Sequence, residues 1–516
     1  MTGTKKIMKT ASLMVVATLL AKICGMLREI LMANAYGTTA GAVAFQTATR
    51  LPLLLFDLVI GGVITASFIP VFNEYLQKDK KQAYDYASSY ITMVFLITLA
   101  ITGVGIIFAR PLVSILAPDL AAQTKDMASA LSIIMFPSII FTGLAFCFVG
   151  ILQSFKRFLV PAVISLVSNL VAIIYFYTLN TRFGITGLAW AMLIGWSLQL
   201  VIQIPTIIRL KFNPFSHMRG HPGLVKSLKM ALPILISTWV VPLSMLVTMQ
   251  LASYLNQGKA VAALEYSNKL YLIVTGVFSF VITNLIFPYL SRAVVQGESE
   301  KVNKITSVAL RGAVLVLAPV TVLFFVLARP IISVIYQRGQ FSAQDVELTA
   351  QALSFYAVGM IGLAANEVLT KVFFAQKNSK TPMYTSVAVF LITVGVSFAL
   401  YKVMGVSGLA LAGAVGATAG ALLNYLLMQK KQPGMFKGQS MSDLLKILLA
   451  AGVMGAAVLG VFWALGGVPF MSSGFWGQVA LIVSVSAAGA VVYIIMCILL
   501  RVRVFLDNIK IVFGKK

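Results

Sequence analysis

Long apolar runs, broken by short polar or basic segments, follow one another along the chain from residue 11 to residue 500. About 20 apolar residues are what an α-helix needs to cross the hydrocarbon core of a bilayer. The pattern predicts an all-α polytopic membrane protein. Its fourteen expected spans cover residues 11–36, 43–70, 88–109, 127–152, 159–179, 185–208, 229–255, 261–290, 307–328, 349–375, 383–401, 406–428, 444–466 and 476–500.

The composition indicates the same class. Of the 516 residues, 59% are hydrophobic and 11% are charged, whereas about a quarter of the residues in a soluble protein are charged. The net charge of +25 does not point to nucleic acid, because basic residues gather beside membrane spans. The three cysteines, Cys24, Cys147 and Cys497, lie within apolar segments and indicate neither disulfides nor a metal site.

Basic residues are concentrated on one side of the expected spans. The segments on the side of the N-terminus hold 26 Lys and Arg residues, and the opposite loops hold seven. By the positive-inside rule, both termini are expected in the cytoplasm. The last segment, residues 501–516, is too short and too charged to span, so we expect an amphipathic helix on the inner leaflet.

The chain also contains an internal duplication. The stretch Ala109–Ser114 recurs as Ala328–Ser333, and Gly184–Ala189 recurs as Gly405–Ala410 at nearly the same offset along the chain. Each copy holds six spans, an even number, so the repeats are expected to be parallel and to enclose a central cavity. The expected organisation is an N-lobe at residues 1–220, a C-lobe at 221–440, two additional spans at 441–500 and the interfacial tail at 501–516.

A small set of charged residues falls inside the expected spans. A charge at the middle of a spanning helix costs about 2.5–3.5 kcal/mol on insertion scales, so such residues should face a wet cavity or one another. Helical spacing pairs them on single helix faces. The expected pairs are Lys22 with Glu29, Arg50 with Asp57, Glu265 with Lys269, and Glu367 with Lys371.

Arg28 is left over in this pairing, and a guanidinium is well suited to grip a phosphate through two parallel hydrogen bonds. Arg50 and Lys269 are related by the offset of the duplication, which predicts that they face each other across the cavity. With Lys22 and Arg28 they form the predicted anion-binding site. The alternatives are ion pairs that only staple helices and, for Lys371, a side chain that reaches the cytoplasmic interface. Arg311 also lies near a span end, where it can snorkel to the interface.

Sequence motifs for chemistry are missing. No GxxxxGK[ST] phosphate loop occurs, and no Ser/His/Asp or Cys/His constellation can be assembled. The two histidines, His217 and His221, lie in a loop beside Pro222, which disfavours a helical metal site. We expect a transporter without a cofactor, not an enzyme.

The N-terminal block resembles the MurJ (MviN) family of lipid II flippases, in the multidrug/oligosaccharidyl-lipid/polysaccharide exporter superfamily. The resemblance lies in residues 21–31, 35–37, 45–52 and 67–72. It implies fourteen spans, as two six-helix lobes and a final pair. It also implies a protein of the bacterial cytoplasmic membrane that moves undecaprenyl-diphosphate-linked peptidoglycan precursor from the inner to the outer leaflet by alternating access.

The resemblance implies roles for individual residues as well. Arg28 falls on the family's essential first-helix arginine and Glu29 on the acidic residue after it, while Lys269 matches an eighth-helix arginine. The family's second-helix arginine is missing, because this sequence has Phe56 and Asp57 there.

The implied partners are the polyprenyl-diphosphate lipid and the bilayer, with no nucleic acid, and the protein is expected to be a monomer. A coupling cation is a further candidate partner, with Asp57, Glu265 and Glu367 as candidate carboxylates. Two alternatives stand beside this hypothesis. One is a flippase for another polyprenyl-linked glycan or a cation-coupled drug exporter. The surplus of cavity cations disfavours the drug exporter, because such exporters seek cationic substrates. The other is a non-transporting scaffold in cell-wall assembly, which has no need of Arg28.

Overall fold

The structure is a computed structural model that describes residues 2–60, 64–218, 220–281, 286–376, 378–431, 439–468 and 474–512. Within these residues it is built from helices, without a β-strand. The chain forms two compact units, Met1–Ala262 and Ala263–Lys516. The expected lobe boundary at residue 220 stays a prediction.

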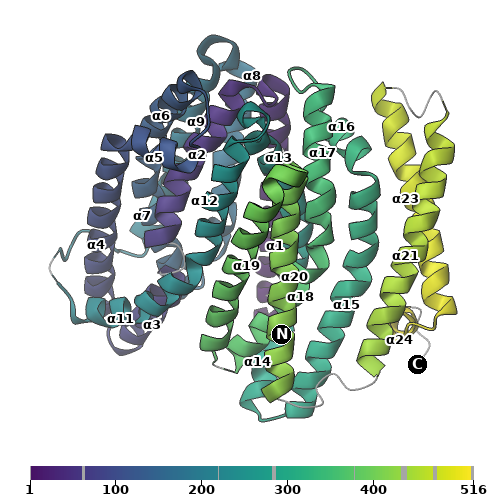
Figure 1. Ribbon diagram of the computed structural model, residues 1–516. Helices are drawn as coiled ribbons and strands as arrows, with labels where there is room; N and C mark the ends of the chain where they lie inside the picture. The colour runs from purple at the N-terminus through teal and green to yellow at the C-terminus, as the bar shows by residue number, and fades with distance from the viewer. Residues whose placement is uncertain are drawn as a thin grey trace. The chain divides into compact units, whose positions relative to one another are not determined.

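Unit 1 begins with a long helix and continues through shorter ones (Figure 1). Its elements are α1 (Thr2–Tyr36), α2 (Ala40–Val59), the π-helical η1 (Ile64–Phe68), α3 (Ile69–Lys78), α4 (Lys80–Ile107), α5 (Ala109–Leu116), α6 (Ala122–Met135), α7 (Ser138–Ser154), α8 (Leu159–Thr178), α9 (Asn180–Val201), α10 (Ile204–Arg209), α11 (Pro222–Thr238), α12 (Val240–Ser253) and the 3₁₀ turn η2 (Asn256–Gly258).

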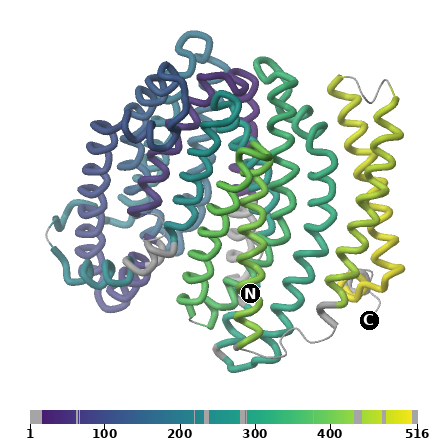
Figure 2. Tube along the Cα trace, viewed as in Figure 1, coloured from purple at the N-terminus to yellow at the C-terminus, as the bar shows by residue number. Residues whose placement is uncertain are grey.

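Unit 2 contains most of α13 and the helices that follow. Its elements are α13 (Lys259–Val281), α14 (Phe287–Val295), α15 (Ser299–Val326), α16 (Ala328–Tyr336), α17 (Ala343–Val358), α18 (Met360–Ala375), α19 (Lys380–Met404), α20 (Val406–Lys431), α21 (Gln439–Gly466), α23 (Gly474–Leu499) and α24 (Arg503–Val512). The trace runs from α19 directly into α20 through Gly405 (Figure 2).

Ten helical segments of the described chain are long and apolar enough to cross a membrane, and the bent pair α17–α18 makes eleven. These eleven correspond to eleven of the fourteen expected spans. The other three, 11–36, 229–255 and 261–290, overlap helices that lie partly outside the described residues or side chains. The count of fourteen therefore stays a prediction, while the all-helical membrane architecture is confirmed.

The duplication is visible in the local geometry of the two copies. Helices α5 and α16 begin at the equivalent residues Ala109 and Ala328, after residues with nearly equal dihedrals (φ −102° and −97°). Gly184 and Gly405, which are also equivalent in the duplication, both have positive φ, 51° and 57°, which glycine adopts without a steric penalty. Equivalent sequence positions therefore adopt equivalent backbone conformations.

Side-chain contacts repeat as well. Arg110 Nη2 lies 3.1 Å from an oxygen of Asp126, and Arg329 Nε lies 3.6 Å from an oxygen of Glu347, in the corresponding helices of the second copy. The repeated ion pair supports two homologous folding units. Their parallel arrangement around a central cavity stays a prediction.

Small residues allow helix α20 to pack closely against the bent pair α17–α18. A Cβ at Gly359 would lie 2.7 Å from the Cα of Ala414, and one at Gly362 would lie 2.5 Å from Thr418 Oγ1. The pair bends by 42° at this point. Close approach through small residues is the usual means of helix packing in membranes, where lipid offers no hydrophobic driving force.

The additional helices α21 and α23 lie side by side (Figure 1), and α21 packs along α15. The shared apolar cluster includes Val314 and Ala318 of α15, Ile447 and Met454 of α21, and Val485 of α23. The additional pair is thus fastened to unit 2 by continuous packing, not attached at one end only.

A buried ion pair reinforces this packing. Arg311 of α15 donates from Nη1 to Asp443 Oδ2 of α21 at 2.9 Å, and their side chains are 17% and 3% exposed. Its position near a span end allows Arg311 to snorkel to the interface, and in the structure its side chain points to the Asp443 carboxylate. Pairing offsets part of the cost of burying each charge, so breaking the pair would be destabilising.

A second polar contact compensates a proline. Pro319 lies inside α15 and has no N–H, so the Leu315 carbonyl four residues earlier loses its helical donor. The Tyr493 hydroxyl of α23 donates to this carbonyl at 2.8 Å. A neighbouring helix therefore satisfies the carbonyl where water is absent.

The tail is helical as expected. Helix α24 spans ten residues, Arg503–Val512. Val502 and Val504 are buried, while Arg503 and Asp507 are exposed, so one face packs on unit 2. Residues 513–516 of the expected tail lie outside the described chain, and its position on the inner leaflet stays a prediction.

The Tyr493 contact can be tested by a double-mutant cycle. Tyr493→Phe should lower the free energy of unfolding by about 1 kcal/mol, because the half-buried Leu315 carbonyl loses its donor. In a Pro319→Ala background the loss should shrink, since residue 319 regains an N–H for Leu315. Denaturant unfolding in detergent measures both, with the 65% exposed Tyr384→Phe as control. An equal loss in both backgrounds would contradict the assignment.

Candidate substrate-binding site

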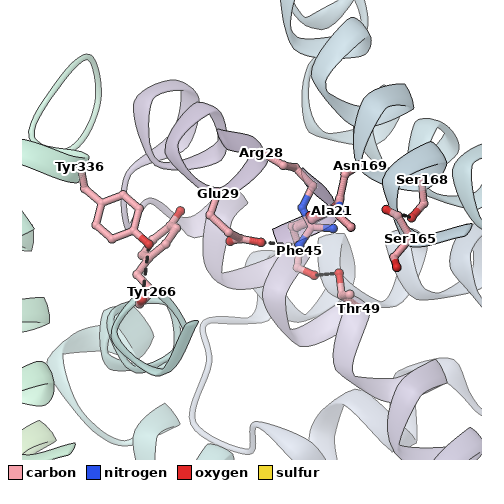
Figure 3. Close-up of polar contacts among 10 residues, drawn as sticks. All are labelled: Ala21, Arg28, Glu29, Phe45, Thr49, Ser165, Ser168, Asn169, Tyr266 and Tyr336. Carbon is pink, nitrogen blue, oxygen red and sulfur yellow. Dashed lines mark hydrogen bonds and ion pairs between the residues drawn. The ribbon is translucent and has the colours of Figure 1, made fainter. Parts of the chain in front are cut away.

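The charged residues of the first span form a close ion pair. Arg28 Nη2 lies 2.5 Å from Glu29 Oε1 in α1 (Figure 3). The Arg28 side chain is 23% exposed and that of Glu29 is 6% exposed. Helical spacing predicts that Glu29 pairs with Lys22, but its ion pair is with Arg28. In the described residues Lys22 is half-buried and has no ion-pair partner. Within the expected span 11–36, the cation left over is therefore Lys22 and not Arg28.

Packing against α8 holds α1 in place. Asn169 of α8 donates from Nδ2 to the Ala21 carbonyl at 3.3 Å (Figure 3). The Asn169 side chain lies beside Gly25, where a Cβ would be 3.4 Å from Asn169 Nδ2, an ordinary van der Waals distance. Asn169 is buried, and Ser168 beside it accepts from Gln199 Nε2 at 2.9 Å. The backbone one to two turns before Arg28 is thus anchored by a buried polar contact.

Arg50 and Asp57 lie on α2, two turns apart, and attract each other electrostatically. Arg50 is half-buried and Asp57 is exposed. This attraction is the one that helical spacing predicts. Just before Arg50, the Thr49 hydroxyl donates to the Phe45 carbonyl one turn earlier at 2.8 Å (Figure 3). This hydrogen bond satisfies the hydroxyl within α2.

Glu265 and Lys269 lie one turn apart on α13 in unit 2. Glu265 is 9% exposed and Lys269 is half-buried. Between them, Ser267 donates to the Thr349 carbonyl of α17 at 2.7 Å. The rings of Tyr266 and Tyr336 lie 5.2 Å apart, and the Tyr336 hydroxyl donates to the Tyr266 carbonyl at 3.4 Å (Figure 3). These contacts fix α13 against α16 and α17.

Glu367 and Lys371 occupy α18, also half-buried. Lys371 Nζ lies 5.7 Å from the ring centroid of Phe287 in α14, a cation–π distance. The side chain thus has an aromatic neighbour within unit 2, which adds a role to the two that the sequence suggested.

The structure therefore assigns the expected site residues to two groups. Unit 1 holds Lys22, Arg28, Glu29, Arg50 and Asp57, and unit 2 holds Glu265, Lys269, Glu367 and Lys371. The meeting of Arg50 and Lys269 across a cavity would join the two units and stays a prediction.

Sequence reasoning missed two structural contacts between helices far apart in the chain. The Arg311–Asp443 pair joins residues 132 positions apart, and the Tyr493–Leu315 contact joins residues 178 apart. The proline in α15 is the one sequence signal that a carbonyl there needs an outside donor.

Comparison with known proteins identifies the family. The model of the family described as lipid II flippase MurJ matches residues 32–500. The chain belongs to this family.

Two relatives illustrate the similarity to the MurJ family. The lipid II flippase MurJ of Burkholderia cenocepacia is 29% identical over 425 residues, covering 80% of this chain and 82% of the relative. A probable lipid II flippase MurJ of Buchnera aphidicola subsp. Schizaphis graminum is 25% identical over 495 residues, covering 95% and 96%.

Solved structures show the same relationship. A lipid II flippase MurJ in an inward closed conformation has a TM-score of 0.81 at 25% identity and covers 95% of this chain. An inward-facing MATE multidrug transporter of the MOP superfamily has a TM-score of 0.69 at 13% identity over 83% of this chain. The second similarity shows the fold alone. The chain is thus a multi-pass membrane protein of the MurJ family.

The Arg28–Glu29 pair should contribute to stability because its carboxylate is buried. Glu29→Gln removes the charge and keeps the shape, so it should cost about 2–3 kcal/mol. The exposed pair Lys301–Glu298, at 2.8 Å with side chains 57% and 43% exposed, is the matched control. Glu298→Gln should cost at most about 1 kcal/mol. Thermal unfolding of the purified protein compares the two, and equal small losses would disprove the structural importance of the buried pair.

Proposed function

We propose that this protein is a flippase that translocates undecaprenyl-diphosphate-linked peptidoglycan precursor, lipid II, from the inner to the outer leaflet of the bacterial cytoplasmic membrane. The observation that carries the proposal is the match of the MurJ family model over residues 32–500. The structural similarity to a lipid II flippase over 95% of the chain supports it. The protein acts as a monomer without catalysis, with both termini in the cytoplasm.

A diphosphate headgroup needs positive charge along its path. Transfer of an isolated ion into hydrocarbon costs tens of kcal/mol, so the path must be hydrated and lined by opposite charges. Lys22, Arg28 and Arg50 in unit 1 and Lys269 in unit 2 are the cations that we assign to this role. Each lies within a helix, half-buried.

Arg28 is the best phosphate ligand of the four. One of its terminal nitrogens bonds Glu29, which orients the guanidinium and leaves its other N–H groups to donate. A guanidinium can hold two phosphate oxygens at once. Glu29 thus acts as the positioning residue of the pair.

The lipid tail can stay in the bilayer beside the protein. Unit 2 has an open cavity of about 1000 Å³ between α13, α14 and α15, which we call the tail groove. Its lining is almost wholly apolar, and its polar members are Lys304 and Tyr289. Its α15 wall runs from Lys304 to Val320, a rise of about 24 Å at 1.5 Å per residue. One leaflet offers about 15 Å of hydrocarbon, so the groove suits a chain longer than an ordinary acyl chain.

Alternating access supplies the movement, and the membrane potential can supply about 2.3 kcal/mol per charge per 100 mV. A coupling cation would be drawn by Asp57, Glu265 or Glu367. The similarity to a multidrug transporter does not favour a drug substrate, because the cations of this chain suit an anionic headgroup.

Complementation tests the proposal directly. In a bacterium depleted of its own flippase, the wild-type chain should restore growth. Arg28→Ala and Lys269→Ala should not, because each removes a phosphate-binding cation, while Lys402→Ala, at an exposed helix end, should behave as wild type. Failure of the wild-type chain, with membrane expression confirmed, would overturn the lipid II assignment. Full rescue by both alanine variants would overturn the binding site.

The groove has its own test. A Cβ at Gly312, which lines the groove, meets no atom within 4 Å, so Gly312→Phe should fold and fill the tail path. We expect at least a tenfold loss of precursor exposure to an impermeant reagent on the outer leaflet, equivalent to about 1.4 kcal/mol. Gly395→Phe, at an equally open position on α19, is the control. Equal export by both variants would exclude this groove as the tail path.

A further inference from the structure

We infer that unit 2 carries a glycan-binding pocket at one end, separate from the cationic residues of the spans. The pocket has a volume of about 460 Å³ and is formed by residues of α16, α17, α21 and α23. The helix termini that meet there include the start of α17 at Ala343 and the last turn of α21 before Gly466. By the positive-inside rule this end is expected to face the outside of the cell.

The lining combines an aromatic ring with amides. Trp463 lines the pocket and is 80% exposed, although it belongs to a helix packed on both α15 and α23. Gln337 and Gln478 line it with side-chain amides. A sugar ring presents an apolar face to aromatic side chains and polar groups at its edge, so this combination suits a pyranose.

Hydrogen bonds within the lining decide which groups can bind a ligand. The Ser333 hydroxyl donates to Gln337 Oε1, which occupies one lone pair of that oxygen and orients the amide, so its NH₂ group remains as a donor. Gln478 can both donate and accept. Together they match a ligand with carbonyl oxygens and hydroxyl or amide hydrogens, such as an N-acetylated sugar.

The charge of the pocket argues against a phosphate ligand. Arg329 is the cation in the lining, and its Nε lies 3.6 Å from a Glu347 oxygen. The local charges therefore offset each other. The floor is apolar, with Val346 and Leu481, so the pocket favours a neutral, amphipathic ligand.

The rim is held in place by contacts outside the pocket. The guanidinium carbon of Arg338 lies 5.7 Å from the ring centroid of Phe475, a cation–π contact between the segment after α16 and the start of α23. Ser342 and Asp345 form a reciprocal capping box at the start of α17. A pre-formed rim lowers the ordering cost of binding a ligand.

The ligand can come from two sources with the same chemistry: the sugar headgroup of a lipid-linked glycan, or a soluble glycan. The first source rests on the proposed flippase function, and the pocket would then hold the headgroup of the exported lipid on the outer side. The binding of a sugar as such does not rest on it.

The experiment is a binding titration on the full chain in nanodiscs, which avoids maltoside detergents because their sugar headgroups would compete. The probes are an N-acetylglucosamine trisaccharide and the same trisaccharide joined to farnesyl diphosphate. Calorimetry gives the Kd, and tryptophan fluorescence reports on Trp463. Trp463→Ala and Gln478→Ala should each weaken binding about tenfold, as expected for the loss of one stacking or hydrogen-bonding group. Trp463→Phe should restore most of the affinity.

The matched control is Trp190→Ala, because Trp190 of α9 is 50% exposed and does not line the pocket. It should bind both probes as wild type does. Binding of both probes supports a site that recognises the sugar itself. Trp463-dependent binding of the lipid-linked probe alone supports the headgroup of a lipid-linked glycan as the source of the ligand. Absence of binding, or binding unchanged by Trp463→Ala, would overturn the pocket and make Trp463 a membrane-interface residue. Neither result bears on the complementation test.

Discussion

Hydrocarbon offers no hydrogen bonds, so every backbone polar group inside the membrane must find its partner within the protein, and every charge must face a partner or water. This constraint explains the all-helical architecture, because a helix satisfies its own N–H and C=O groups. It also explains the exceptions. Where Pro319 interrupts the ladder of α15, a tyrosine from another helix supplies the missing donor. Among the charges inside the spans, Arg28 lies within bonding distance of an opposite charge, Glu29.

The same constraint separates structural charges from those available for binding. Arg311 has its Asp443 partner nearly buried, and the pair joins α15 to α21. Arg28 is more exposed than Arg311, and its partner Glu29 bonds to a single terminal nitrogen, Nη2, of the guanidinium. A flippase needs cations that are held but not fully neutralised, since a cation locked into a salt bridge has little left to offer a phosphate. Lys22, with no ion-pair partner in the described chain, is the cation left over within the expected span 11–36.

The two helices after the duplicated units are structurally integrated. They share an apolar cluster with α15, contribute the Tyr493 and Asp443 contacts, and provide half of the walls of the proposed glycan pocket. In the proposed function, α15 therefore connects three features: the tail groove on one face, the additional helices on another, and the short helix α16 that follows it. Any displacement of α15 would act on all three.

The sequence by itself determined the membrane class, eleven of the helical segments, the duplication and the residues that place charge inside spans. These properties depend on the length, composition and order of local segments, which can be read directly from the sequence. The family resemblance, carried by residues 21–72, also came from the sequence. Only the tertiary structure decided which partners the charges take. It paired Glu29 with Arg28 where the helical period suggested Lys22, and it turned Arg311 toward a carboxylate 132 residues away. The reason is physical. A long apolar run shows that a segment is a membrane helix, but it does not fix how that helix is rotated about its axis or where it crosses its neighbours. Those properties depend on close packing at small residues such as Gly359 and Gly489, whose contact partners lie on other helices.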